Sequence, residues 1–194
     1  MSAQDVIDAT KEKVSSLIEP ISGGVGDDVS YDEMFESMKA EVEKMTSLEG
    51  GKPDWGKITS NGDELLSDKS KDFRVALYFA AAKAQLDGPA GLLEGLVVLQ
   101  ELTAAYWDTM YPPLRRPKAR GALCGWFSDV SGPAIAGMQP TAKDRDLITA
   151  LDEVSKSVDA DLRTRLEDAY GGMSAIRSAV RNLLQAVPAE APPP

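Results

Sequence analysis

The chain has 194 residues, of which 43% are hydrophobic and 27% charged, a balance typical of one globular domain. Its net charge of −10 argues against binding of nucleic acids or anionic membranes, because phosphate recognition uses clustered lysine and arginine. Histidine is absent, which excludes histidine-based catalytic triads, histidine-ligated zinc and Glu-x-x-His di-iron sites. No apolar run is long enough to span a bilayer, and a single cysteine, Cys124, favours a reducing cytoplasm.

Two amphipathic helices separated by a glycine-containing loop are predicted at the start of the chain. The first covers residues 4–18 and stops at Pro20. The loop at 21–28 lacks the Lys-Ser/Thr ending of a phosphate-binding loop. Ser30 with Glu33 three residues later matches a capping box, so we expect the second helix to begin there. Its apolar stripe, interpreted as core, comprises Tyr31, Phe35, Met38, Val42 and Met45.

A short helix is then expected from Pro53-Asp54, although Gly62 is unfavourable in its middle. Its inward residues are Trp55, Ile58, Leu65 and Leu66.

Residues 71–114 are the most apolar part of the chain and predict a central helical hairpin. The break falls at residues 87–89 (Asp-Gly-Pro), where glycine ends one helix and proline begins the next. Ser70 is the expected N-cap of the first helix, with Asp72 in its first turn. This helix is apolar nearly all round, as buried helices are. A buried Arg74 within it requires a nearby acid, for which Asp72 and Asp108 are the candidates.

The second helix of the hairpin has one apolar and one acidic face. The acids Glu94, Glu101 and Asp108 recur at seven-residue spacing, which is too far apart for one metal ion and predicts a solvated face. The apolar face comprises Leu92, Leu96, Leu99, Tyr106 and Met110.

Three more elements are predicted after the extended turn at Pro112-Pro113. A helix begins near Pro117 and ends at Gly132-Pro133, with an inert buried thiol at Cys124. The longest helix covers residues 142–169 and is followed by a last helix from Ser174, and the two are expected to pack antiparallel. The inward residues of the helix near Pro117 are Ala119, Leu123, Trp126 and Val130.

These elements predict an all-α fold of about seven to eight helices around a central apolar hairpin, with a C-terminal helix pair. We expect the domain to cover residues 1–187. Residues 188–194 are rich in proline and read as an extended linker to a C-terminal region that this chain does not contain.

Several motifs, in a fixed order between residues 20 and 127, resemble one family. They are Pro20-Ile21-Ser22, Tyr31-Asp32, Pro53-Asp54-Trp55, Ser70-Lys71-Asp72-Phe73-Arg74-Val75-Ala76, Gly88 with Gly91-Leu92, Tyr106-Trp107-Asp108, Tyr111-Pro112-Pro113-Leu114, and Arg120-Gly121-Ala122-Leu123 leading to Trp126. This pattern is similar to the ImpA/TssA N-terminal domain of bacterial type VI secretion systems. The resemblance implies a non-enzymatic, cytoplasmic docking or scaffold component that contacts baseplate, tube, sheath or membrane-complex proteins.

The resemblance also divides the motif residues into two sets, and it implies no catalytic, cofactor-binding or metal-binding residue. The structural set comprises Trp55, Asp72, Phe73, Arg74, Tyr106 and Trp126. The set that forms a candidate partner surface comprises Trp107, Asp108, Tyr111, Pro112, Pro113 and Leu114. Because a large aromatic beside two prolines suits either an exposed anchor or a packed turn, both interpretations of Trp107 and Tyr111 stay open.

Two features depart from the family pattern. The loop after Pro113 is short and basic (Arg115-Arg116-Pro117-Lys118), whereas family members often carry a longer acidic or polar insert, so partner choice is expected to differ. The second departure is that the chain stops at the proline-rich segment, whereas family proteins continue into a C-terminal region. Higher-order assembly is expected from that region and is not carried over to this chain.

Two other functions remain as alternatives. The first is a cytosolic chaperone or adaptor for a single secreted cargo. The second is a small helical enzyme that uses carboxylates such as Asp27, Asp28 or Asp72, although none of these lies in a partnered catalytic motif.

Overall fold

The computed structural model describes residues 1–190, 192 and 194, and within these residues it is all-α, as predicted. Short π and 3-10 turns (Leu65–Lys69, Ala142–Asp144 and Glu167–Ala169) adjoin the main helices. Among the described residues, no helix combines the length and apolar character that crossing a membrane requires. The α-helices are α1 (Ala3–Lys13), α2 (Ser15–Ile18), α3 (Glu33–Glu43), α4 (Trp55–Glu64), α5 (Phe73–Tyr106), α6 (Pro117–Ala136), α7 (Arg145–Leu166) and α8 (Ser174–Ala186).

Helix α5 is the predicted central hairpin. Its two halves meet at Gly88, which has φ 61° and ψ −141°, a conformation that glycine adopts without strain. The halves fold back on each other so closely that a Cβ added to Gly95 would overlap Ala80. Nearly every apolar side chain of α5 is buried, which explains why its sequence is apolar on all sides.

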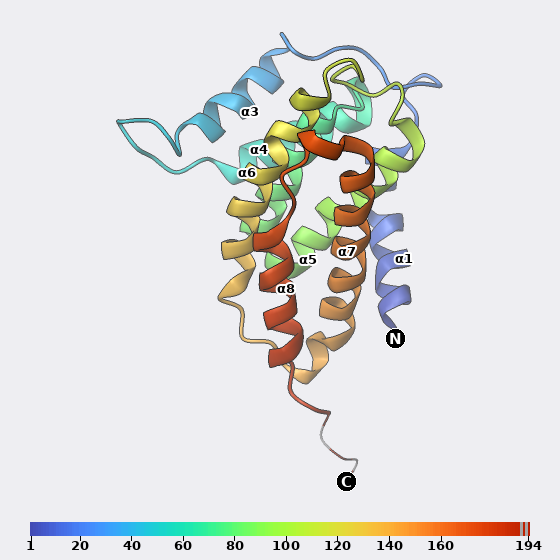
Figure 1. Cartoon of the computed structure of the whole chain (residues 1–194), viewed down its shortest axis with the longest axis vertical. Coiled ribbons are helices and arrows are strands. Elements are labelled where there is room, and N and C mark those ends of the chain that lie inside the picture. The colour runs from blue at the N-terminus through green and yellow to red at the C-terminus, as the bar shows by residue number, and fades with distance from the viewer. Residues whose placement is uncertain (191, 193) are drawn as a thin grey trace.

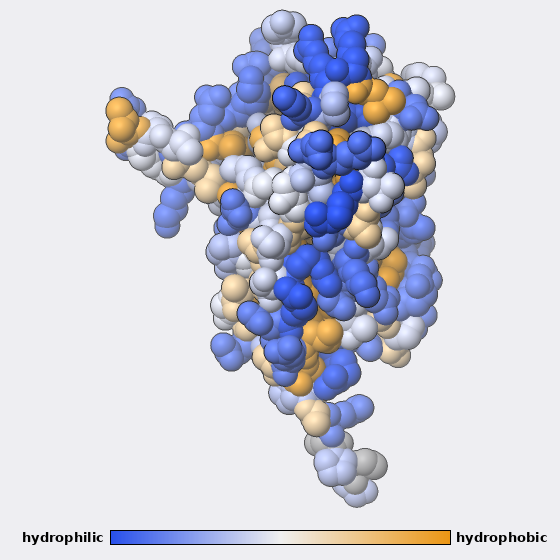
Figure 2. Space-filling view, in the orientation of Figure 1, coloured by the Kyte–Doolittle hydropathy of each residue, from blue (hydrophilic) through white to orange (hydrophobic). Residues whose placement is uncertain are grey.

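The other helices cover this hairpin on several sides. Helices α4, α6 and α7 pack against α5, and α8 packs against both α6 and α7. Figure 1 shows α7 and α8 side by side along the long axis, which confirms the predicted C-terminal pair. Helix α3 packs against α4, and the loop after α3 projects from the body (Figure 1). Figure 2 shows an apolar spot at the tip of this projection, and Leu48 of the loop is fully exposed.

The N-caps of α3 and α5 differ from the prediction by two residues. Helix α3 begins at Glu33 with Asp32 as its cap, because Ser30 instead donates its hydroxyl to Asp28 at 2.6 Å. Helix α5 is capped by Asp72 rather than Ser70, whose backbone is extended and bridges to Gly26. Because α3 begins at Glu33 and ends at Glu43, two residues of its predicted stripe lie outside it and are exposed: Tyr31 and Met45.

Helix α6 differs from the prediction in both face and length. Residues of its predicted inward face, such as Leu123 and Trp126, are only half-buried. The helix also continues past Gly132-Pro133 to Ala136, because Gly132 packs directly against Ala175 of α8 and holds the segment in place. The fully buried face lies one residue further along the chain and comprises Arg120, Cys124, Phe127, Ser131 and Ile135.

The acidic stripe of α5 was predicted to face solvent, and this is wrong for Glu94. Glu94 is 8% exposed, because α1 covers it and its carboxylate pairs with Lys13 and, at 3.1 Å, with Lys83. Glu101 pairs with Lys11 of α1 at 3.1 Å. Of the three acids only Asp108 is exposed.

The C-terminal half follows the prediction closely. Thr141 and Asp144 form a capping box, and α7 with its flanking 3-10 turns covers residues 142–169. Helix α8 buries Ile176, Val180 and Leu183. The predicted linker over 188–194 includes residues 191 and 193, which lie outside the described residues, so it stays a prediction, as does the domain boundary at 187.

The close contact between the halves of α5 predicts opposite effects for two glycine substitutions. Gly95→Ala should lower the free energy of unfolding by about 2 kcal/mol, because the added methyl group overpacks against Ala80. Gly125→Ala in α6 is the matched control, since an added Cβ there meets no atom within 4 Å. It should raise stability by about 0.5 to 1 kcal/mol through helix propensity. Urea unfolding measures both, and a stabilising Gly95→Ala would contradict the hairpin packing.

Candidate protein-interaction surface

The segments at the two ends of α5 pair with each other through their backbones. Phe73 N–H donates to the carbonyl of Tyr111 at 2.7 Å, and Tyr111 N–H donates to the carbonyl of Lys71 at 3.0 Å. We call residues 70–74 and 106–113, together with Arg120, the signature corner. The corner closes the open end of the hairpin, opposite the break at Gly88.

Asp72 organises the first half of the corner. Its fully buried carboxylate caps α5 by accepting the Arg74 N–H at 2.8 Å, and it accepts the Arg74 guanidinium at 3.2 and 2.7 Å. The acid that Arg74 requires is therefore Asp72 and not Asp108. Burial alone would lower the pKa of Arg74, but the hydrogen bond and charge of Asp72 outweigh it and raise that pKa. The guanidinium also lies 4.6 Å from the ring centroid of Phe35.

Arg120 organises the second half of the corner. Its side chain is fully buried, and its guanidinium donates to the carbonyls of Trp107, Met110 and Pro112 at 2.6, 2.6 and 2.7 Å. Burial lowers its pKa. The rigid fork of the guanidinium suits this task, because its donors reach three carbonyls that point in different directions. The turn after α5 is thereby fixed by a residue of α6.

Trp107 packs within the corner. Its ring meets Phe73 edge-on at 5.9 Å, Arg120 lies 4.5 Å from its centroid, and Arg165 of α7 lies 5.4 Å from it. The ring is half-buried, and Pro112 next along the turn is buried. This geometry favours the interpretation in which Trp107 fixes the turn, while a direct role in partner binding stays a prediction.

The remaining residues of the structural set lie near the hairpin. Tyr106 donates its hydroxyl to the carbonyl of Ile18 at 2.6 Å, which ties the end of α5 to α2. Trp126 of α6 stacks edge-on against Tyr78 at 5.4 Å. Trp55 is half-buried at the start of α4.

Lys71 is a second fully buried cation. Its ammonium donates to the carbonyls of Leu17 and Leu66 at 2.8 and 2.6 Å, so it joins α2 to the turn that follows α4. Burial lowers the pKa of Lys71 to about 8. The sequence analysis assigned no structural role to Lys71 or Arg120. The signal that identified Arg74, a cation within an otherwise apolar helix, could also have identified these two residues.

The outward side of the corner is polar and exposed. Asp108 is exposed, Leu114 is 41% exposed, and Arg115, Arg116 and Lys118 follow on the surface. Of the candidate partner surface, then, Asp108 and Leu114 face solvent, while Tyr111 and Pro113 are half-buried.

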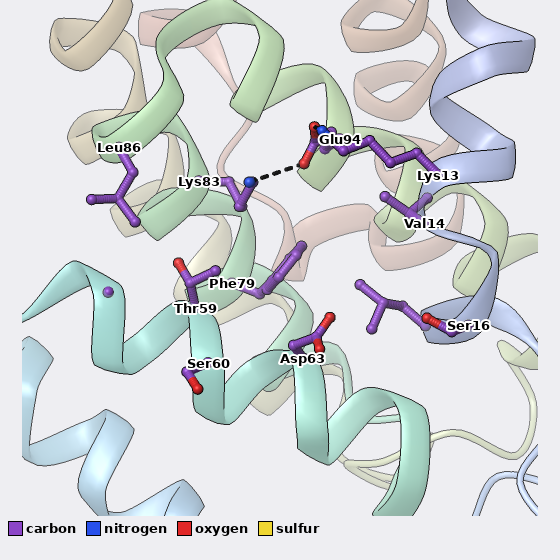
Figure 3. A pocket seen from close by; sticks show the side chains of 12 residues that line it. Lys13, Val14, Ser16, Thr59, Ser60, Asp63, Phe79, Lys83, Leu86 and Glu94 are labelled. Carbon is purple, nitrogen blue, oxygen red and sulfur yellow. Dashed lines mark hydrogen bonds and ion pairs between the residues drawn. The ribbon is translucent and has the colours of Figure 1, made fainter.

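A cavity of about 380 Å³ lies elsewhere, between the α1–α2 junction, α4 and α5. Figure 3 shows Phe79, Val14 and Asp63 around it, with Lys83 held by Glu94 on one wall. Glu94 also pairs with Lys13, and Lys83 pairs with Asp87 as well, so each of the two lysines that line the cavity has an acidic partner in this chain.

Of the three carboxylates considered for catalysis, Asp72 and Asp28 accept hydrogen bonds from other side chains of this chain, and Asp27 lies exposed on the surface. Asp72 binds Arg74, which also reaches the hydroxyl of Ser30 at 3.2 Å, and Ser30 in turn binds Asp28. The Ser30 hydrogen bonds lower the pKa of Asp28. Asp27 is exposed. In the described part of the chain, no three His, Cys, Asp or Glu residues are grouped to hold a metal ion. Cys124 is buried, which raises its pKa to about 12.

Loss of the Arg120 guanidinium should destabilise the whole domain. Arg120→Met leaves three buried carbonyls without donors and should lower the free energy of unfolding by about 3 kcal/mol or more. Arg115→Met removes an exposed arginine nearby and should change it by less than about 0.5 kcal/mol. Urea unfolding compares the two, and equal stability of both variants would show that Arg120 does not hold the turn.

Lys71 should make stability depend on pH. The unfolded chain keeps this ammonium protonated up to its ordinary pKa of 10.5, whereas the folded chain releases the proton near pH 8. The unfolded state therefore binds more protons above pH 8, and stability should rise with pH there. We expect the stability difference between the native chain and Lys71→Met to grow in favour of the native chain from pH 8 to 10. Lys156→Met, which removes an exposed lysine, is the matched control.

Comparisons with known proteins agree with this arrangement. Residues 18–129, which include the whole signature corner, match the family described as ImpA, N-terminal, type VI secretion system. A curated relative, the type VI secretion system component TssA1 of Pseudomonas aeruginosa, is 33% identical over 96 residues. That region covers 46% of this chain and 28% of the relative, so the chain corresponds to a minor part of the relative's length.

The fold also matches a solved structure, the N-terminal domain of the TssA component from Burkholderia cenocepacia, which includes its conserved ImpA_N region. The TM-score is 0.66 at 19% identity, covering 89% of this chain and 90% of the other. Because the family match extends over more than half of its residues, the chain belongs to the ImpA N-terminal family of type VI secretion systems.

Proposed function

We propose that this chain is a non-enzymatic docking component of a cytoplasmic type VI secretion machine. Its partners would be protein parts of that machine, from the baseplate, tube, sheath or membrane complex. The observation that carries the proposal is that charged residues in the family-matched region bind other groups of the chain. Asp72, Arg74 and Arg120 bind protein groups within the corner rather than lining an open reaction site. The family match, which spans the corner, supports the same conclusion.

The corner suits docking because it is rigid on the inside and exposed on the outside. Three carbonyls of the turn are fixed by Arg120, and Tyr111 is fixed by backbone pairing. A surface held in one conformation loses little entropy when a partner binds. We therefore assign the contact face to the segment that leaves the corner, residues 114–118.

Site-specific photo-crosslinking tests this assignment in cells that contain the complete apparatus. A photoreactive amino acid replaces Leu114, which is 41% exposed beside the corner. The matched control replaces Leu86, which is 51% exposed but lies next to the break of α5, at the far end of the hairpin. We expect position 114 to crosslink to a baseplate, tube, sheath or membrane-complex protein, identified by mass spectrometry, and position 86 to crosslink far less.

Two outcomes would count against the proposal. Crosslinks from position 114 to a single secreted cargo, without any machine component, would indicate a chaperone. Equal crosslinking from positions 114 and 86 would show that the contact face is not at the corner.

A further inference from the structure

The loop that leaves the signature corner carries three cations, Arg115, Arg116 and Lys118. Arg115, Arg116 and Lys118 are all exposed, and within the described residues their side chains make no ion pair or hydrogen bond. Arg116 contributes to the low pKa of Asp28, but that carboxylate is held by Ser30. In the described part of the chain, three cations without an ion pair therefore lie within four positions, although the net charge of the chain is −10.

The same residues enclose an apolar hollow. A depression of about 470 Å³ is lined by Arg115, Arg116, Pro117, Lys118 and Ala119. Long basic side chains line such a surface with their methylene stems while their charges stay in water. Leu114, partly exposed at the start of the loop, adds a neighbouring apolar side chain. The loop therefore offers an apolar floor with a cationic rim.

Local backbone structure adds to the positive potential and fixes the loop. Helix α6 begins at Pro117, and its N-cap residue Arg116 provides no side-chain cap, so the helix dipole adds a positive partial charge at this end. On one side the loop follows Pro112, whose carbonyl Arg120 holds, and on the other it continues into α6. The cations thus extend from a fixed segment.

We propose that residues 114–118 bind an acidic segment of a partner protein. Two or more carboxylates of that segment pair with Arg115, Arg116 and Lys118, and an apolar side chain enters the hollow beside Leu114. This inference rests on the proposed function and names the partner chemistry at the same face. A short acidic peptide fits better than a nucleic acid, because the large negative charge elsewhere on the chain repels a long polyanion.

Fluorescence anisotropy with a defined probe tests the proposal. The probe is a labelled peptide, Gly-Asp-Glu-Leu-Asp-Glu-Phe, with both ends blocked, and its control has Asn and Gln in place of Asp and Glu. We expect saturable binding of the acidic peptide, about tenfold weaker or absent binding of the amide peptide, and loss of affinity as sodium chloride rises from about 50 mM to about 300 mM.

Two charge-reversal variants locate the binding site. Arg115→Glu/Arg116→Glu/Lys118→Glu should weaken binding at least about tenfold. The matched control, Lys143→Glu/Lys156→Glu/Arg181→Glu, changes net charge equally at exposed cations that form no ion pair with any described residue. It should bind within about threefold of the native chain once its added charge is screened. Circular dichroism should show that both variants are folded.

Several results would overturn the inference. They are no binding of the acidic peptide at low salt, equal binding of the amide peptide, equal weakening by both variants, and preference of the loop for an oligonucleotide over the peptide. If the peptide fails to bind while position 114 still crosslinks to a machine component, the inference is wrong and the docking function stands. If the peptide binds but no crosslink forms, the docking function fails instead.

Discussion

The corner of this domain depends on the hydrogen bonds that the guanidinium of Arg120 donates to the turn after α5. The guanidinium is fully buried and satisfies three carbonyls of the turn that ends α5. A buried charge is costly unless hydrogen bonds surround it, so the turn and the arginine require each other. The turn also positions Tyr111 so that its backbone pairs with Lys71 and Phe73, and this pairing closes the hairpin at its open end. Through this closure a local contact of α6 determines how the two halves of the central helix are held.

This arrangement separates the structural role of the corner from recognition. Inside the corner, Asp72 binds Arg74, and Trp107 packs against Phe73 and Arg120. These contacts leave few polar groups of the three side chains available to a partner. The exposed loop at 114–118 is attached to that rigid frame and carries unpaired charge. We therefore expect partner choice to depend on the loop rather than on the corner.

The hairpin, the capping box at Thr141 and the last two helices were predictable, because continuous apolar faces, glycine-proline breaks and capping pairs are local signals. The N-caps at Asp32 and Asp72 were missed because Ser30 and Ser70 are equally good caps by sequence. Ser30 is instead engaged by Asp28 two residues earlier, and Ser70 by a long-range backbone bridge to Gly26. The face of α6 was misplaced because a buried arginine breaks the apolar pattern. The pairing of Glu94 with Lys13 is long-range and has no local signal.

Amide hydrogen exchange of the native chain tests most directly whether a rigid corner presents an open loop. The account predicts that the amides of Phe73 and Tyr111 exchange as slowly as those in the middle of each half of α5, because both are paired within the corner. The amides of Arg115 and Lys118 should exchange orders of magnitude faster, since both residues lie on the surface of the loop. Rapid exchange at Tyr111, or protection of the loop equal to that of α5, would contradict it.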